Sequence, residues 1–344
     1  MKKPIKGYKA FNKDMTCKGF QYEEGKTYEC NNAKCCQEGF HLVLDPLDAL
    51  TYYNIVDSVF CEVEALGKID KNKHDTKIST TKIRIGSKLD LKAYIKASID
   101  FCLSTCKSKK QASSGDYAMQ ASGEYGATQA SGGDYAKQVS GGNYAKQVSS
   151  GNYATQVSSG DSAKQTSGGD GTTQVSSGCG AKQTSSGYGA MQVSSGYSAT
   201  QASSGDSAKQ VSSGNYAKQA SGGNYAMQAS GGNYAKQVSG GDCATQASSG
   251  YSATQSSSGD YAKQASSGNY TTQELNGKDS VAVNAGHNGK VKAKIGCWIC
   301  LSEWKQRADK SWYPAYVKAG QIDGKNLKEN VWYKLKGGKF VPVH

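Results

Sequence analysis

The middle of the chain repeats a single nonapeptide, and this repeat decides the fold. One copy, at residues 210–218, reads Gln210-Val211-Ser212-Ser213-Gly214-Asn215-Tyr216-Ala217-Lys218. Gln recurs every nine residues from Gln111 to Gln273, so that 18 consecutive copies fill residues 111–272. Gln at position one and Ser at position three never change, whereas position nine varies among Lys, Thr and Met. Such regular self-similarity indicates a stack of similar structural units.

Alternation within the unit predicts which side chains face inward. Positions eight, one and three lie two residues apart, so an extended segment presents their Ala, Gln and Ser on one face. Because these positions vary least, we assign them to the interior, where stacked Gln and Ser form hydrogen-bonded ladders. The opposite orientation would bury the Lys side chains and is disfavoured. The predicted ladder begins with Gln111, Gln120, Gln129, Gln138, Gln147, Ser113, Ser122 and Ser131.

Positions seven, nine and two alternate with the inward positions and are predicted to face outward. They carry mainly Tyr, Lys/Thr/Met and Ala/Val. We expect the outward Tyr and Lys side chains to form an extended binding face. Its predicted members are Tyr117, Tyr135, Lys137, Tyr144, Lys146, Tyr153, Tyr216, Lys218, Tyr225, Tyr234, Lys236, Tyr261 and Lys263.

The Ser/Gly-Gly-Asp/Asn segment between the strands is typical of a tight turn. We expect Gly at position five to supply a positive φ, which Asn or Asp at position six also tolerates. A short strand and a turn every nine residues predict a β-solenoid, in which two units form one flattened coil of 18 residues and the repeats form about nine coils. Disorder is the alternative, because a Gly/Ser/Gln-rich segment buries little apolar surface. The unbroken Gln and Ser register favours the solenoid.

The N-terminal flank, residues 1–110, is predicted to be a small α+β domain. Apolar residues alternate over residues 58–66, which indicates a strand, and a second strand is expected over 77–85. Asp45-Pro46 predicts a helix start, with Asp45 as the N-cap. Apolar residues at helical spacing predict a helix over residues 89–106, which we expect to cap the solenoid.

The C-terminal flank, residues 273–344, begins with decayed repeats, since Gly277 and Gly286 keep the nine-residue phase. Alternating apolar segments and a Gly337-Gly338 hairpin signal then predict a small β cap. The expected strands cover residues 281–283, 291–293, 297–304, 315–322, 331–335 and 340–343. The fold class is therefore mainly β, a β-solenoid between two small domains.

Charge is distributed unevenly along the 344 residues. The net charge is +13, of which residues 1–110 carry +6 and residues 273–344 carry +7, while the repeats are neutral with eight Lys, seven Asp and one Glu. The basic flanks are consistent with attraction to an acidic partner. No run of 18 apolar residues occurs, and the eleven cysteines, an odd number without a regular framework, fit reduced thiols. We therefore expect a cytoplasmic protein and no membrane partner.

The N-terminal flank resembles an uncharacterised family of bacterial and phage proteins. The residues that carry the resemblance are Gly7-Tyr8-Lys9-Ala10-Phe11, Gly19-Phe20-Gln21-Tyr22-Glu23, Gly39-Phe40-His41, Pro46-Leu47-Asp48 and Tyr52-Tyr53. Proteins of this family similarly join such a module to short Gly/Ser repeats and a β-rich C-terminal end. The resemblance implies this architecture, a phage origin and hence a host cytoplasm, and no established activity.

A catalytic site in the N-terminal flank is a competing hypothesis. Gly39-Phe40-His41-Leu42 with Tyr52-Tyr53 also resembles the NAD-cradling segment of ADP-ribosyltransferase folds. That resemblance implies His41, Glu62 and Glu64 as the residues to test for catalysis. Structural packing of an aromatic-rich domain explains the same residues, because fold-level analogy alone does not establish chemistry. We expect no enzyme activity and no cofactor.

Three cysteines and one histidine near the N-terminus are the candidate metal ligands. Cys30, Cys35 and Cys36 cluster in sequence near His41, as in zinc sites. Cys297 and Cys300 form a CxxC that has no second pair, so we interpret them as buried free thiols, and we expect no bound metal. Cys179 and Cys243 fall at outward repeat positions.

These observations favour a non-enzymatic interaction or scaffold protein, built as a rigid rod with an extended binding face. We expect a protein partner, which could be acidic, and self-association through the caps or the solenoid ends. If the phage resemblance holds, that partner is a host defence or nuclease complex that the protein blocks. The alternatives are an enzyme displayed on a repeat spacer and a rod that binds polysaccharide or nucleic acid.

Overall fold

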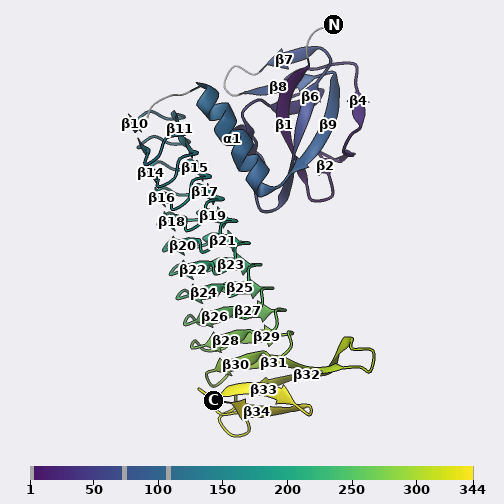
Figure 1. Ribbon diagram of the computed structural model, residues 1–344, viewed down its shortest axis with the longest axis vertical. Coiled ribbons are helices and arrows are strands. Elements are labelled where there is room, and N and C mark those ends of the chain that lie inside the picture. The colour runs from purple at the N-terminus through teal and green to yellow at the C-terminus, as the bar shows by residue number, and fades with distance from the viewer. Residues whose placement is uncertain (1–3, 72–75, 106–109, 344) are drawn as a thin grey trace.

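A computed structural model of the chain describes residues 4–71, 76–105 and 110–343. Figure 1 shows an N-terminal domain beside one end of a long solenoid and a small β cap at the other end. The mainly β fold and the solenoid predicted from the repeats are confirmed. In the part of the chain that the structure describes, no helix is long and apolar enough to span a membrane.

A seven-stranded sheet in the order β4-β9-β6-β1-β5-β8-β7 forms the N-terminal domain. Its strands are β1 (Ile5–Asn12), β4 (Thr27–Glu29), β5 (Phe40–Val43), β6 (Ser58–Ala65), β7 (Ile69–Lys71), β8 (Lys77–Thr80) and β9 (Lys82–Leu89), and a separate pair is formed by β2 (Thr16–Cys17) and β3 (Phe20–Gln21). β1 pairs with β6 along its whole length but with β5 at the single position Tyr8–Val43. Strands β1 and β5 diverge on either side of that pair.

The strand predicted over residues 77–85 is in fact two strands. β8 pairs with β5 and β7, whereas β9 pairs with β6 and β4, so the chain crosses to the other side of the sheet at Thr81. Thr81 holds the crossing through backbone and side-chain hydrogen bonds to Lys68. Ile78 before the crossing and Ile83 after it lie in the same apolar core although they are five residues apart, so the side-chain alternation changes phase there.

Two helices follow the sequence signals. Asp45 caps the 3-10 helix η1 (Pro46–Thr51), where its side chain accepts a 2.9 Å hydrogen bond from the Leu47 N–H. Helix α1 (Leu91–Thr105) follows β9, and residue 106 at the predicted helix end lies outside the described residues. The Tyr94 hydroxyl donates to the Pro46 carbonyl at 2.6 Å, which joins the two helices.

The solenoid stacks parallel strands in register 18 residues apart, so that Gln pairs with Gln and Ser with Ser. One face, which we call the lysine sheet, contains β10 (Lys110–Ser113), β12 (Thr128–Ser131), β14 (Lys146–Ser149), β16 (Lys164–Ser167), β18 (Lys182–Ser185), β20 (Thr200–Ser203), β22 (Lys218–Ser221), β24 (Lys236–Ser239), β26 (Thr254–Ser257), β28 (Thr272–Leu275) and β30 (Lys290–Ala293). The other face, which we call the docking sheet, contains β11 (Met119–Ser122), β13 (Lys137–Ser140), β15 (Thr155–Ser158), β17 (Thr173–Ser176), β19 (Met191–Ser194), β21 (Lys209–Ser212), β23 (Met227–Ser230), β25 (Thr245–Ser248), β27 (Lys263–Ser266), β29 (Val281–Asn284) and β31 (Trp298–Gln306). The stack spans residues 110–301 in about 11 coils, so it continues through the decayed repeats.

Glutamine ladders fill the space between the two sheets, in the orientation that the alternation predicts. The Gln210 amide nitrogen donates to the Gln192 side-chain oxygen at 2.8 Å and to the Ala220 carbonyl of the opposite sheet at 2.8 Å. Each Gln therefore links successive coils and also bridges the two sheets. Buried, hydrogen-bonded amides replace the large apolar core that the repeats lack.

Glycine at position five has a different role from the one predicted. Its φ is not positive; the positive φ lies at position seven, for example 57° at Tyr216. A Cβ at Gly214 would lie 1.9 Å from the Gly196 carbonyl oxygen in the preceding coil, so only Gly allows the coils to stack. Glu124, the one exception among the repeats, belongs to the first coil and has no earlier repeat beside it.

The C-terminal cap ends the stack with antiparallel strands. β31 turns back as β32 (Trp312–Gln321), and β33 (Trp332–Lys336) pairs with β30 and then with β34 (Lys339–Val343). Its core replaces the Gln ladder with apolar side chains, including Val291, Ile299 and Leu301. An antiparallel hairpin on each sheet thus covers the last coil.

The N-terminal domain is attached to the docking sheet. Helix α1 packs along the strands β11, β13 and β15, and Ile95 and Ile99 lie in one apolar cluster with Val139 and Val157. The helix that we expected to act as a cap therefore covers the side of the first coils (Figure 1).

Candidate functional site

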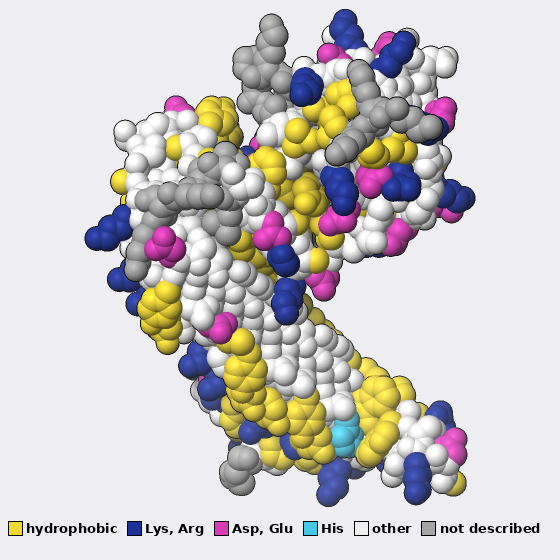
Figure 2. All heavy atoms as spheres, turned by 45° about the horizontal axis from the view of Figure 1, so that its top comes forward, with side chains coloured by type: hydrophobic (Ala, Val, Ile, Leu, Met, Phe, Trp, Pro, Cys, Tyr) yellow, Lys and Arg dark blue, Asp and Glu magenta, His cyan; other side chains and the backbone are white. Residues whose placement is uncertain are grey.

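Alternate repeats place their turns on opposite edges of the solenoid. The turns that follow docking-sheet strands form what we call the tyrosine edge, where seven rings follow one another without a break. Successive ring centroids lie 4.5–5.8 Å apart. The row consists of Tyr197, Tyr216, Tyr234, Tyr251, Tyr270, His287 and Trp312. Figure 2 shows hydrophobic side chains gathered in a band along the solenoid.

The predicted binding face is divided between the two edges. Tyr144, Tyr216 and Tyr234 lie on the tyrosine edge, and Lys146, Lys218 and Lys236 lie beside it at the start of lysine-sheet strands. The remaining predicted tyrosines lie on the opposite edge and are Tyr117, Tyr135, Tyr153, Tyr225 and Tyr261. Lys263 lies on the docking sheet. The predicted residues therefore form two separate surfaces.

Sequence analysis missed the rings that make the row continuous. Tyr197 and Tyr251 stand at position six, one residue before the predicted Tyr position, and Ser198 and Ser252 follow them at position seven. His287 and Trp312 come from the decayed repeats and the cap. In these repeats Tyr stands one position earlier and Ser or Gly takes position seven, where the backbone has a positive φ that strains a bulky residue. This paired change in the sequence indicates that Tyr at position six replaces Tyr at position seven.

Charge is also separated between the edges. Six of the seven repeat aspartates lie on the edge opposite the tyrosine edge, at Asp116, Asp134, Asp170, Asp206, Asp242 and Asp260, and we call it the aspartate edge. Five of the eight repeat lysines begin lysine-sheet strands next to the tyrosine edge, at Lys146, Lys164, Lys182, Lys218 and Lys236. Tyrosines thus lie on both edges of the neutral repeat, but one edge carries most of the aspartates, and the other carries the continuous row of rings and is flanked by most of the lysines.

Lys137 does not belong to the binding face to which its sequence position assigned it. Its ammonium group lies 2.9 Å from an Asp45 carboxylate oxygen and 2.5 Å from one of Asp48, and its side chain is 17% exposed. Burial lowers the pKa of Lys137, but the charges of Asp45 and Asp48 outweigh this effect. The net result is a raised pKa, which keeps the lysine charged. The residue anchors the N-terminal domain to the solenoid.

A shallow groove, which we call the bay, lies on the uncovered part of the docking sheet. It has a volume of about 660 Å³, with Leu91 of the N-terminal domain at one end and Ala285 at the other. Its floor consists of Val and Ala at repeat position two between rows of Ser. Figure 1 shows the N-terminal domain and the β31–β32 hairpin projecting from this same side of the solenoid.

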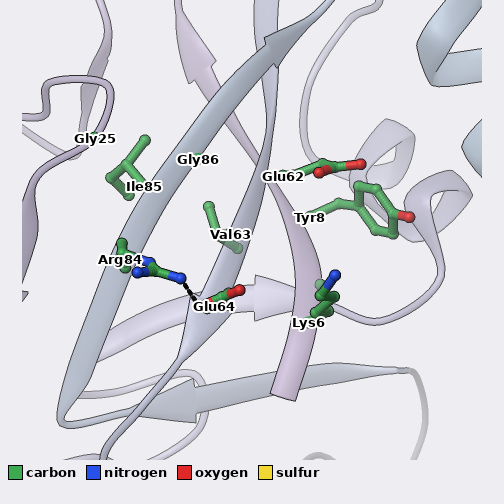
Figure 3. Close-up of a pocket in the computed structure, with 10 residues that line it drawn as sticks. Lys6, Tyr8, Gly25, Glu62, Val63, Glu64, Arg84, Ile85 and Gly86 are labelled. Atoms are coloured by element: carbon green, nitrogen blue, oxygen red, sulfur yellow. Dashed lines mark hydrogen bonds and ion pairs between the residues drawn. The ribbon is translucent and has the colours of Figure 1, made fainter. Parts of the chain in front are cut away.

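The residues proposed for catalysis do not converge. Glu62 and Glu64 line a pocket of about 380 Å³ on the sheet of the N-terminal domain, where Glu64 forms an ion pair with Arg84 (Figure 3). His41 lines a different pocket, of about 370 Å³. A glutamate that acts together with a histidine must share a substrate with it, and this arrangement separates the two.

The N-terminal cysteines and His41 take part in contacts with the backbone. The His41 Nε2 atom accepts a 2.9 Å hydrogen bond from the Cys36 N–H, and the thiols of Cys30 and Cys35 lie near the carbonyls of Asn32 and Lys77. Over residues 4–71, 76–105 and 110–343, no group of three or more His, Cys, Asp or Glu side chains is arranged to hold a metal ion.

The CxxC cysteines lie where the solenoid meets its cap. Cys297 is fully buried and its thiol donates to the Gly277 carbonyl at 3.2 Å, while Cys300 is partly buried on β31; both are free thiols. Burial raises the pKa of each thiol, which favours the protonated form.

Comparisons with known proteins concern the N-terminal domain. Neither the curated proteins nor the solved structures that were searched contain a match to this chain. The stretches that carry the sequence resemblance, from Gly7 to Tyr53, lie within a region that matches a family. Residues 5–97, from β1 into α1, match an uncharacterised family domain described as Domain of unknown function (DUF7666).

Proposed function

We propose that the protein is a non-enzymatic interaction scaffold whose solenoid holds an extended acidic segment of a partner protein along the tyrosine edge. The observation that carries this proposal is the unbroken row of seven rings from Tyr197 to Trp312. The Tyr and Trp rings of the row are each 42–52% exposed. Aromatic side chains supply large contact areas at low entropic cost, and a row of them on a rigid stack is already ordered before binding.

The lysines beside the row define the chemistry of the partner. Tyr216, Tyr234, Lys218 and Lys236 together line a hollow of about 320 Å³. Because the aspartates lie mainly on the other edge, this side of the solenoid attracts negative charge. A protein segment with Asp or Glu at intervals fits a surface on which aromatic rings recur with the coils, about 4.8 Å apart, and the ammonium groups of Lys218 and Lys236 lie beside them.

The ring geometry favours protein over nucleic acid or polysaccharide. Binding of single-stranded nucleic acid uses free ring faces on which bases stack. Along the tyrosine edge, every ring has a neighbouring ring close by: Tyr216 and Tyr234 stack with centroids 5.0 Å apart, and the other pairs are tilted or edge-to-face, which restricts the insertion of bases. The exposed part of each ring can contact a peptide backbone and carboxylates.

Direct binding measurements on the full chain test this proposal. A fluorescent polyglutamate peptide, a thymidine oligonucleotide and alginate would be titrated against the wild type and against a variant with Tyr216→Ser, Tyr234→Ser, Lys218→Ser and Lys236→Ser. We expect the peptide to bind most tightly and the variant to lose about tenfold or more in affinity. Ser already occupies position seven at Ser198 and Ser207, so the solenoid tolerates it.

The matched control changes the opposite edge. Tyr117→Ser, Tyr135→Ser and Tyr153→Ser remove three stacked rings from the aspartate edge. The proposal requires this variant to bind the peptide as the wild type does. Equal losses in both variants would contradict it, and tighter binding of the oligonucleotide or of alginate would replace it with one of the alternative rods.

The biological partner is proposed from the resemblance alone. If the chain is phage-encoded, it acts in the host cytoplasm, and a host defence or nuclease complex is the partner that it blocks. Restoration of phage growth in cells that carry such a complex, by the wild type and not by the tyrosine-edge variant, would support this assignment. No effect of either protein on phage growth would contradict it.

A further inference from the structure

A second pocket of the N-terminal domain has the size and lining of a small-molecule site. It encloses about 370 Å³ beside the single pairing position of β1 and β5. Tyr8, Tyr52 and Tyr53 supply aromatic surface, and Leu42 and Val43 supply aliphatic surface. Small organic ligands occupy mostly apolar pockets of about 300–1,000 Å³ with a few polar groups.

Lys9 lines this pocket as a buried cation. Lys9 is 7% exposed. Its ammonium group donates to the His41 carbonyl at 3.0 Å and lies 3.6 Å from the Cys17 sulfur. The rings of Phe11 and Tyr22 lie 5.4 Å away. Among the described residues, none of the ion pairs includes Lys9, and burial lowers its pKa. A buried charge without a counter-charge is costly, so the pocket is arranged for an anion.

The other ionisable groups around the pocket strengthen this field. Lys18 and Lys77 also line it, and its described lining contains no Asp or Glu. Burial, and then the charges of Lys9, Lys77 and Lys18, lower the pKa of His41. Burial and the 3.0 Å contact with Cys17 raise the pKa of Tyr53, so that the phenol keeps its proton. The pocket therefore presents three lysines and neutral hydrogen-bonding groups.

We propose that this pocket binds a small organic anion in which a carboxylate or a phosphate monoester is attached to a flat apolar ring. The anionic group pairs with the Lys9 ammonium, and Lys18 and Lys77 extend the positive field around it. The ring packs among Tyr8, Tyr52 and Tyr53. Carboxylate and phosphate groups both offer negatively charged oxygen atoms to a lysine ammonium group, and titration with one ligand of each type distinguishes them. This ligand site is independent of the tyrosine edge, which lies on the solenoid.

Calorimetric titration of the full chain tests the ligand class. Indole-3-acetate supplies a ring with a carboxylate, adenosine monophosphate a ring with a phosphate monoester, and indole and inorganic phosphate each supply one half of the chemistry. We expect one of the two ring anions to bind at a single site, about tenfold or more tighter than either half. Equal or weaker binding of both ring anions would overturn the proposal.

Lys9→Met tests the site itself, because it keeps the length of the side chain and removes the charge. We expect binding of the ring anion to fall by about tenfold or more, while the melting temperature stays the same or rises because an uncompensated buried charge is lost. Lys13→Met is the control, since Lys13 pairs at the surface with Asp57. Wild-type binding by Lys9→Met would overturn the proposal.

Lys77→Met keeps the test valid if Lys9→Met does not fold. Lys77 lies at the start of β8 and lines the same pocket without being fully buried. We expect this variant to bind the ring anion more weakly than Lys13→Met does. Unchanged affinity in Lys77→Met, together with an unfolded Lys9→Met, would assign Lys9 to the structure of the domain and would overturn the proposal.

Discussion

The solenoid selects residues by the clearance between successive coils. At position five, the carbonyl oxygen of the preceding coil occupies the place where a Cβ would lie, with separations of about 2 Å in one repeat after another. At position four the nearest atoms to a Cβ are about 4 Å away, for example at Gly222, and Ser and Gly alternate there freely. Steric room, not backbone dihedral preference, explains which of the two adjacent glycines varies.

A pair of neighbouring glycines provides a direct test of this clearance. A Cβ at Gly223 would lie 2.1 Å from the Gly205 oxygen, whereas a Cβ at Gly222 would meet nothing closer than 4.0 Å. We expect Gly223→Ala to lower the free energy of unfolding by about 3 kcal/mol and Gly222→Ala to leave it nearly unchanged. Urea denaturation of both variants checks this. Similar values for the two would contradict the stacking argument.

The buried polar side chains differ in how well they are satisfied. Gln210 takes part in three hydrogen bonds, two as donor and one as acceptor from Gln228 at 2.9 Å. Ser212, two residues later, buries a hydroxyl that has no hydrogen-bond partner in the described residues. Its small size, not its hydroxyl, suits the interior.

Substitution by Ala should therefore separate these two positions. Gln210→Ala leaves unpaired groups on both neighbouring coils and should cost about 3 kcal/mol of unfolding free energy. Ser212→Ala removes a hydroxyl that the fold does not satisfy and should be neutral or stabilising by up to about 1 kcal/mol. Thermal denaturation of the two variants compares them. A larger loss for Ser212→Ala would show that the hydroxyl does form a bond.

At the scale of elements, the attachment of the N-terminal domain depends on both apolar and ionic contacts. Ile95 and Ile99 of α1 pack on the docking sheet, while η1 contributes Asp45 and Asp48 to the Lys137 ammonium. The carboxylate side chains of Asp45 and Asp48 are 0% and 13% exposed, so they depend on this lysine for their counter-charge. One repeat residue thus determines where the domain sits along the solenoid.

Lys137→Met should weaken this attachment strongly. It leaves two largely buried carboxylates without their cation, which costs about 3 kcal/mol or more. Lys146→Met, one repeat later, changes an exposed lysine of the lysine sheet and is the control. Urea denaturation monitored by circular dichroism checks the two variants. Equal stability would show that apolar packing alone holds the domain.

At the scale of the whole molecule, the solenoid has a structural period of 18 residues, although its sequence repeats every nine. Odd and even repeats lie on opposite sheets and turn at opposite edges. The two ends of the solenoid therefore keep their relative orientation only when repeats are removed or added in pairs, that is, as whole coils. In the wild type, the N-terminal domain and the β31–β32 hairpin project from the same side of the solenoid (Figure 1), the side on which the bay lies.

Deletion of repeats should distinguish the two periods. Removing residues 210–227, a whole coil, should keep both projections on one side and shorten the solenoid by about 4.8 Å. Removing residues 210–218, a single repeat, should move the cap to the opposite side and divide the tyrosine edge. Small-angle X-ray scattering measures the change in shape, and similar profiles for the two deletions would contradict the 18-residue period.

Local sequence was sufficient for some features and insufficient for others. The Asp45 cap and most strands could be predicted, because capping and alternation depend on neighbouring residues. The crossing at Thr81 was not predicted, although the odd spacing of Ile78 and Ile83 is a local sign of it. The Lys9 pocket was also missed, since its lining comes from segments far apart in the sequence.

The repeat by itself determined the solenoid, its inward Gln ladders and its two-repeat coil, because stacking in register satisfies the identical Gln side chains; the inward Ser is confirmed, but the hydrogen-bonded Ser ladder that was predicted is wrong. Only the tertiary structure decided which edge carries a continuous row of rings beside most of the lysines, and that Lys137 anchors a domain while Lys218 stays at the surface. The physical reason is that repeats with equivalent sequences become inequivalent once the N-terminal domain covers one sheet at one end. The proposed function therefore depends on the positions of the repeats in the stack, which composition does not record.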